Sequence, residues 1–297
     1  MKAIIVALAI VFAVAFMTLA ERKLMGAIQR RVGPNSVGFL GLLQPFADAF
    51  KLILKETVIP LESNHWLFVL APFFSFYLAL VSWLVIPLTK GVVLMDMDLS
   101  ILFILAISSL GVYTIIYTGW SANSKYTLLG SLRSTAQMVS YEIAMSLLVL
   151  TVVYMSASLN LTEMAYLNSG TSLIWALWPM GILGFVAALA ETNRAPFDLP
   201  EAESELVAGF MTEHSAIGFT FLFLGEYANI IMISTVLNLM FFGLYNPLII
   251  YLFIWIRATL PRLRFDQLLR LGWKYMVPFL IGFLMLEPSL LYSLDLF

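Results

Sequence analysis

Residues 2–23 read KAIIVALAIVFAVAFMTLAERK, an almost unbroken apolar run that ends in three charged side chains. A helix needs about 20 mostly apolar residues to cross the hydrocarbon core of a membrane, and this run is long enough. No small-residue cleavage site precedes the charges, so we expect a retained first membrane span and not a signal peptide.

The rest of the chain has the same character. It is 61% hydrophobic and 11% charged, whereas soluble domains average about 25% charged residues. Lipid can cover so much apolar surface, and a soluble core cannot. The sequence therefore predicts an all-α, polytopic membrane protein that forms a single integral membrane domain over residues 1–297. Eight apolar segments are expected to span the bilayer, the seventh being the shortest: 2–21, 66–88, 100–119, 134–156, 172–192, 217–240, 245–260 and 274–295.

The residue types present limit the chemistry. The chain has no cysteine, which excludes disulfides, thiolate clusters and haem attachment through cysteine. Its two histidines, His65 and His214, are too few for a histidine-rich metal site, so we expect no bound metal. A net charge of −2 gives no indication of a nucleic-acid partner. Electrons that this protein handles must therefore be carried by other chains or by a diffusible molecule.

Positive charge predicts how the chain is oriented. Of the sixteen Lys and Arg residues, all but Lys2 and Lys90 lie in the first, third, fifth and seventh connecting segments. Basic loops stay on the side from which a membrane protein is inserted. We therefore expect these loops to face the cytoplasm or the mitochondrial matrix.

The first charged loop contains an amphipathic segment, Leu43–Glu56. Apolar side chains recur there at helical spacing, polar ones line the opposite face, and Pro45 suits a first helical turn. Such a helix lies flat at a membrane surface. It is either a simple interfacial anchor or the roof of a lateral opening through which a lipid-soluble molecule enters.

A carboxylate is expected inside the fourth span. Glu142 follows Arg133 by nine residues, which places it about 13 Å further along a helix. Nine steps of about 100° put the two side chains on opposite faces, so Arg133 cannot neutralise Glu142 within that helix. A carboxyl group buried there is either partly protonated, as a proton relay requires, or held in a structural hydrogen bond.

Two further groups of acids are informative. On the sixth span Phe219, Phe223, Glu226 and Tyr227 share one helical face, and the acid argues that this face lines an interior cavity rather than lipid. In the fifth loop six acids fall among the apolar stretches FDLP and LVAGF, which favours a coupled, partly buried set over a solvated surface loop. These acids are Glu191, Asp198, Glu201, Glu203, Glu205 and Glu213.

Three stretches resemble subunit 1 of respiratory complex I, the proton-pumping NADH:ubiquinone oxidoreductase. They are ERKLMGAIQRRVGPNSVGFLGLLQPFADAFKLILKE at residues 21–56, ETNRAPFDLPEAESELVAGF at 191–210 and FTFLFLGEYANI at 219–230. The resemblance covers nearly the whole chain. This sequence departs from the family pattern at Ala202, Ala208 and His214, where Gly, Ser and Tyr are common.

The resemblance implies an eight-helix heel subunit between the membrane arm and the peripheral arm, in the mitochondrial inner membrane or a bacterial plasma membrane. Its implied partners are the quinone-site peripheral subunits and the small membrane subunits that lead to the antiporter-like pumps. Ubiquinone would be the bound substrate, while flavin and iron–sulfur clusters would belong to other subunits. The isolated chain would have no catalytic residue.

The resemblance also assigns roles to residues of this sequence. Candidates for the wall of a ubiquinone tunnel are Arg22, Arg31, Asp48, Phe221, Phe223 and Tyr227. Candidates for a proton path are Glu142, Glu191, Glu201, Glu203, Glu205, Glu213 and Glu226, with Arg133 and Arg194 as counter-charges.

Two alternatives to this assignment remain. A related membrane anchor of an energy-converting hydrogenase would use ferredoxin and no quinone. A free-standing ion carrier usually shows inverted repeats, and no pair of similar halves is recognisable in this sequence.

Overall fold

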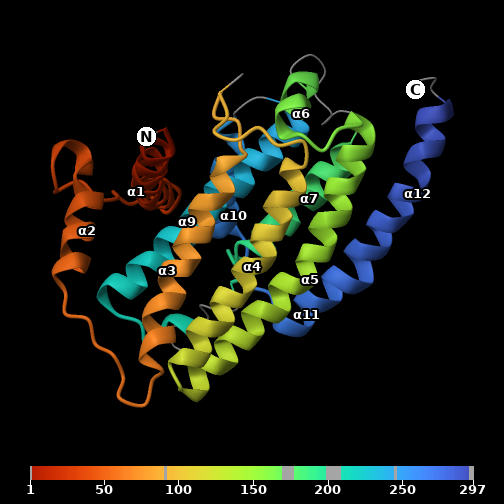
Figure 1. Ribbon diagram of the computed structural model, residues 1–297. Helices are drawn as coiled ribbons and strands as arrows, with labels where there is room; N and C mark the ends of the chain where they lie inside the picture. Colours follow the sequence, from red (N-terminus) through yellow and green to blue (C-terminus); the bar gives the residue numbers. More distant parts are fainter. Residues whose placement is uncertain (1, 90–91, 169–176, 199–208, 244–245, 294–297) are drawn as a thin grey trace.

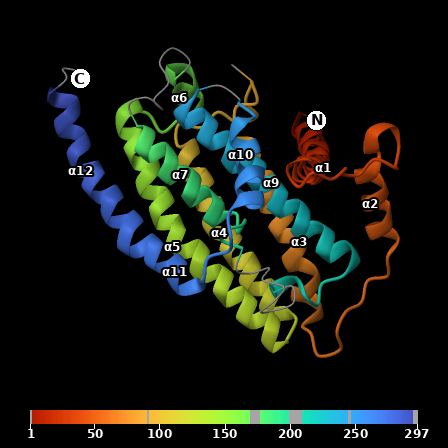
Figure 2. The same cartoon turned by 180° about the vertical axis from the view of Figure 1, so that it is seen from behind.

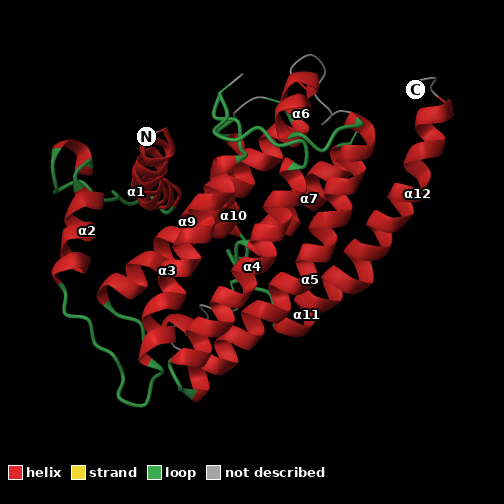
Figure 3. Ribbon diagram, in the orientation of Figure 1, coloured by secondary structure: helices red, strands yellow, loops and turns green. Residues whose placement is uncertain are grey.

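The computed structural model describes residues 2–89, 92–168, 177–198, 209–243 and 246–293. In these ranges the chain forms helices joined by loops, without a named β-strand (Figure 3). The helices are α1 (Lys2–Ile28), α2 (Gln44–Leu54), α3 (His65–Val81), α4 (Ser100–Ser121), α5 (Lys125–Ser156), α6 (Leu161–Asn168), α7 (Trp178–Glu191), α9 (Ala216–Phe241), α10 (Leu248–Thr259), α11 (Phe265–Arg270) and α12 (Val277–Ser293).

The predicted all-α membrane architecture is confirmed. Among the described residues, six helical segments are long and apolar enough to cross a membrane: α1, α3 with its 3-10 extension to Leu84, α4, α5, α9, and the continuous α11–α12 segment. The shorter apolar helices α7 and α10 coincide with the expected fifth and seventh spans. The first part of the expected fifth span, 172–176, lies outside the described residues.

Three expected boundaries were wrong, because charged residues were taken to end the helices. Helix α1 continues past its charges to Ile28, and the last helical segment begins at Phe265 and passes through a π-helical stretch, Leu271–Met276. Helix α5 begins at Lys125 because the Ser124 hydroxyl caps it, accepting a hydrogen bond from the backbone N–H of Thr127 at 3.2 Å. Several basic residues assigned to loops therefore lie on helix ends.

The helices form one bundle with α9 at its centre. Helix α9 packs against α3, α1, α7, α6, α10 and α2. Figures 1 and 2 show α1 and α2 at one edge of the bundle and α12 at the opposite edge. Several of the largest fully buried side chains, including Tyr141, Leu148, Met180 and Met240, come from α5, α7 and α9. The described residues that follow α7 and precede α9, 192–198 and 209–215, therefore lie next to the core.

The amphipathic segment forms the expected helix, with Pro45 in its first turn. Helix α2 packs against α1 and α9. The ring of Phe46 lies 6.2 Å from that of Phe12 and 6.3 Å from that of Phe16, both on α1. Phe50 and Leu54 remain exposed, so α2 presents apolar surface beyond its contact with the bundle.

A close approach to α5 gives a testable prediction. A Cβ atom on Gly130 would lie 2.8 Å from the backbone nitrogen of Phe210 and 2.9 Å from Cα of Gly209, atoms that cannot move independently. We expect Gly130→Ala to lower the stability of the full chain by about 1–3 kcal/mol, as overpacking does. The measurement is the unfolding midpoint of the purified full chain in mild detergent.

Gly111 on α4 provides the control, because a Cβ there would meet no atom within 4 Å. Alanine is favoured over glycine in a helix interior by about 0.5–1 kcal/mol, so Gly111→Ala should be neutral or stabilising. Equal midpoints for the two variants would contradict the close approach of α5 to residues 209–211.

Candidate functional site

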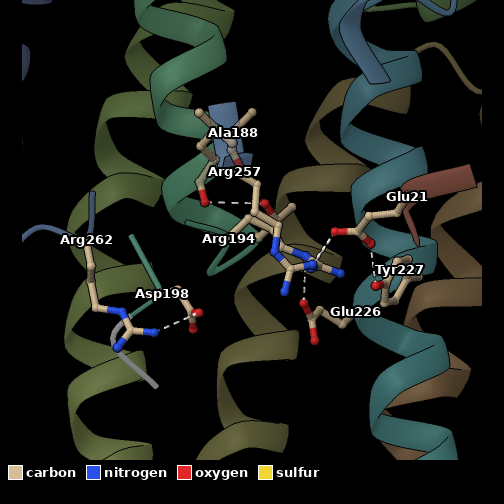
Figure 4. A network of polar contacts seen from close by, with 10 residues as sticks. Glu21, Ala188, Arg194, Asp198, Glu226, Tyr227, Arg257 and Arg262 are labelled. Carbon is tan, nitrogen blue, oxygen red and sulfur yellow. Dashed lines mark hydrogen bonds and ion pairs between the residues drawn. The ribbon is translucent and has the colours of Figure 1, made fainter. Parts of the chain in front are cut away.

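Glu21, on the last turns of α1, is a buried acid with 4% of its surface exposed. Arg194 Nη1 lies 3.3 Å from its Oε1, and Arg257 from α10 pairs with the same oxygen. The hydroxyl of Tyr227 donates a hydrogen bond of 2.5 Å to Oε2 (Figure 4). Removing a carboxylate from water is costly unless it is paired and hydrogen-bonded, and these three partners meet that requirement.

Arg194 joins Glu21 to a second acid. Its Nε lies 3.0 Å from Oε1 of Glu226 on α9. Its guanidinium carbon also stands 4.4 Å from the centre of the Tyr227 ring, a cation–π contact. One buried cation is thus shared between two carboxylates, as Figure 4 shows.

A short loop after α7 places Arg194 at this position. Helix α7 ends at Glu191, and the backbone N–H of Arg194 donates to the carbonyl of Leu189 at 3.1 Å. Asn193 adopts the left-handed conformation with φ of 52°, which asparagine tolerates better than most residues. Beyond it the N–H of Phe197 donates to the carbonyl of Arg194 at 2.8 Å. The loop therefore folds back on the end of α7 and directs Arg194 into the bundle.

Glu191 faces a group of internal cavities. A cavity of about 60 Å³ is lined by Glu191, Glu226 and Asn229 among others. A second of about 60 Å³ shares Glu191 and Asn229 and adds Ser108 and Thr114. A cavity needs about 10–15 Å³ to hold one water molecule. Both are therefore large enough to hold several waters, and the first extends from Glu191 to Glu226.

A third cavity next to Glu191 is different. It measures about 40 Å³, and apart from Glu191 and Ser108 its lining is apolar, from α4, α5 and α9. Its walls offer few polar partners to a water molecule. Glu191 thus lies where polar and apolar cavities adjoin.

The other predicted proton-path residues are distributed as follows. Glu142 is half-buried on α5 and repels Glu191 electrostatically, so these two acids belong to one group. Glu213 is exposed. The guanidinium of Arg133 lies over the ring of Phe265 at 6.0 Å. Glu201, Glu203 and Glu205 lie outside the described residues, as do Ala202 and Ala208.

The predicted tunnel residues fall into four places. Arg22 pairs with Asp48 at 2.6 Å, which links α1 to α2 in a partly exposed position. Phe223 stacks between Phe219 and Tyr227, with ring centres 5.8 and 4.7 Å away, so the expected aromatic face of α9 is present.

The remaining two do not join this face. Phe221 packs instead on α3, where its ring lies 5.7 Å from that of Phe76 and 6.0 Å from that of Phe73. Arg31 is exposed and its Nε donates to the side-chain oxygen of Gln29 at 2.8 Å.

Sequence reasoning missed Glu21, Arg257 and Glu287. Glu21 was grouped with the charged loop, although a single acid beside Arg22 and Lys23 at the end of an apolar run was a visible signal. Glu287 lies on α12 with 3% of its surface exposed, and no periodicity singled it out. Asp198, which was considered as part of the acidic loop, pairs with Arg262 at 3.3 Å.

His214 is buried next to the start of α9. Its ring stacks on Phe68 with centres 4.0 Å apart and planes 12° from parallel. Burial lowers the pKa of His214 to about 4, although a backbone hydrogen bond involving Thr118 acts in the opposite direction. The imidazole is therefore neutral at pH 7. Within the described ranges no group of three or more His, Asp or Glu side chains is arranged to bind a metal ion.

Comparison with known proteins agrees with these features. A family model described as NADH dehydrogenase matches residues 1–287. NADH-ubiquinone oxidoreductase chain 1 of Hyaloraphidium curvatum is 87% identical over 297 residues, which is the whole of both chains.

More distant relatives carry corresponding names. NADH-ubiquinone oxidoreductase chain 1 of Mycosarcoma maydis is 50% identical over 320 residues, covering 100% of this chain and 97% of that protein. A subunit of the NADH-quinone oxidoreductase of Rickettsia bellii is 47% identical over 320 residues, covering 99% and 94%. These similarities confirm the resemblance to subunit 1 of complex I, in preference to a hydrogenase anchor or a carrier. The chain therefore belongs to the NADH dehydrogenase family, the membrane subunits that correspond to chain 1 of the NADH–quinone oxidoreductase complex.

Proposed function

We propose that this chain frames the opening through which ubiquinone enters the complex and carries a path of buried acids that couples quinone reduction to proton translocation. The observation that carries this proposal is the sharing of Arg194 between Glu21 and Glu226, beside a cavity that Glu191 also lines. Acids and bases concentrated inside a membrane protein mark ion or proton pathways.

The quinone part of the proposal rests on α1, α2 and α9. The Arg22–Asp48 pair holds the surface helix against the first span, and exposed apolar side chains of α2 offer contact to a lipid-soluble tail. The stacked rings of Phe219, Phe223 and Tyr227 offer an apolar wall that suits a prenylated quinone. Arg31 and Phe221 remain candidates through the family resemblance alone.

Tyr227 links this wall to the acids. Its ring ends the aromatic stack and its hydroxyl donates to Glu21, so one side chain contacts both parts of the proposed machinery. A change of charge or position at the wall would alter the hydrogen bond to Glu21. The strength of the ion pair between Glu21 and Arg194 would then change, and with it the extent to which Arg194 neutralises Glu226.

The proton path would continue through the polar cavities. Protonation of Glu226 removes its attraction for Arg194, and waters in the cavity can pass a proton between Glu226 and Glu191. The repulsion between Glu191 and Glu142 favours a proton shared between them. Glu201, Glu203, Glu205 and Glu213 would connect this group to the quinone side, and Arg133 would be a further counter-charge.

The wider assembly completes the proposal. Flavin and iron–sulfur clusters of peripheral subunits would deliver electrons to ubiquinone, and neighbouring membrane subunits would receive the coupling signal. The chain would lie in the mitochondrial inner membrane with its basic loops facing the matrix.

The direct test of the proton path is Glu226→Gln in the assembled complex. The amide cannot exchange a proton or pair with Arg194 as a carboxylate does, so quinone-linked NADH oxidation should fall at least about tenfold. NADH oxidation by artificial acceptors at the flavin should be unchanged. Exposed Glu62 supplies the control, and Glu62→Gln should keep both activities. Full quinone-linked activity in Glu226→Gln would exclude Glu226 from the path.

The test of the quinone wall is Phe223→Ala. Loss of the ring removes apolar contact worth about 1.4 kcal/mol or more, which corresponds to a tenfold rise in the apparent KM for long-tailed quinone. Phe74 on α3 is a half-exposed control, and Phe74→Ala should leave that KM unchanged. An unaltered KM in Phe223→Ala would remove this residue from the wall.

A further inference from the structure

Gln137 holds both ends of the loop that carries Arg194. It lies on α5 with none of its surface exposed. Its Nε2 donates to the carbonyl of Ala190, in the last turn of α7, at 2.8 Å. The same nitrogen donates to the carbonyl of Phe197, at the far end of the loop, at 2.9 Å. Both N–H bonds of one amide are thus used to join the two ends.

The amide also has a fixed orientation. If it were turned over, its oxygen would face two carbonyl oxygens, which have no hydrogen to donate. A buried carbonyl left without its donor costs about 1–3 kcal/mol. The loop therefore loses two hydrogen bonds together if Gln137 is replaced by an apolar side chain.

The loop between these two carbonyls determines where Arg194 lies. Its backbone is closed by bonds from Arg194 to Leu189 and from Phe197 to Arg194. The guanidinium then lies 3.0 Å from Glu226 and 3.3 Å from Glu21. A shift of about 1 Å in this loop would change both ion pairs, and misplacement by that distance can cost about a hundredfold in a catalysed rate.

We propose that Gln137 is the positioning residue for Arg194: its amide sets the loop so that one guanidinium is shared between Glu21 and Glu226. The consequence for proton transfer rests on the proposed function, whereas the position of Arg194 does not. Gln137 contacts neither acid in its two amide bonds, and it acts through the backbone of the loop.

The chain contains a matched control for this role. Asn168 on α6 is also buried, and its Nδ2 donates to the carbonyls of Leu239 and Met240 at 3.0 and 2.7 Å. It ties α6 to the last turn of α9, more than three helical turns beyond Glu226 on that helix. Replacing Asn168 removes the same number of hydrogen bonds without touching the Arg194 loop.

The experiment compares Gln137→Met with Asn168→Met in the assembled complex. The first readout is the position of Arg194 in a cryo-electron microscopy structure of each variant. The second is the pH profile of quinone-linked NADH oxidation, with flavin-site NADH oxidation as the reference for assembly. In Gln137→Met we expect Arg194 to leave Glu226, the quinone-linked rate to fall about tenfold and the profile to shift. Asn168→Met should keep the position, rate and profile.

If the complex with Gln137→Met assembles poorly, a second variant, Gln137→Glu, tests the same role. In Gln137→Glu the carboxyl can donate a hydrogen bond to a carbonyl only when protonated. A protonated carboxyl donates one hydrogen bond where the amide donates two, so the quinone-linked activity, relative to the unmodified complex, should recover in part as the pH is lowered. No such recovery is expected for Asn168→Asp.

The outcomes separate this inference from the proposed function. Arg194 displaced with an unchanged pH profile would support the positioning role and count against the proton path. Arg194 in place in Gln137→Met, or equal effects of the Gln137 and Asn168 variants, would overturn the positioning role. Absence of pH recovery in Gln137→Glu would also overturn it.

Discussion

The bundle is organised around one buried negative charge, that of Glu21. A carboxylate in this position must be neutralised and hydrogen-bonded, or its burial would cost several kcal/mol. Its partners come from three different parts of the chain: the loop after α7, helix α9 and helix α10. The requirement to reach the same carboxylate fixes how these three segments stand relative to α1. Apolar packing holds the helices together, and these polar contacts add a requirement that favours one register.

Helix α1 is longer than its apolar run. Helix α1 carries Glu21 on its buried side and continues to Ile28, while the neighbouring Arg22 is directed towards α2 and pairs with Asp48. Adjacent residues on a helix point about 100° apart, so one turn can serve the interior and the surface helix at once. The aromatic face of α9 meets this turn through Tyr227. The proposed quinone wall and the acid cluster are therefore parts of one contact region.

The membrane spans could be predicted from the sequence because a helix in lipid requires a long apolar run. The ends of the helices could not be predicted in this way. Ser124, which caps α5, was a visible signal, but the polar stretch from Lys125 to Arg133 was taken for a loop. Glu226 and Arg194 could be proposed from their surroundings in sequence and from family resemblance. The pairing of Arg194, Tyr227 and Arg257 with Glu21 spans 173, 206 and 236 residues, and no local pattern encodes such contacts. Glu21 was therefore missed although its neighbours were considered.

The charge balance of the cluster bears on how it would respond to a proton. Glu21 and Glu226 carry two negative charges, and Arg194 and Arg257 carry two positive ones. Addition of one proton to Glu226 would leave an uncompensated positive charge inside the bundle, where Coulomb interactions are several times stronger than in bulk solvent. That charge would stabilise the ionised form of Glu191, which lines the same cavity as Glu226. On the proposed function, protonation of Glu226 thus favours proton release from Glu191. A single proton can have this effect because the two carboxylates and the two guanidinium groups carry no net charge beforehand.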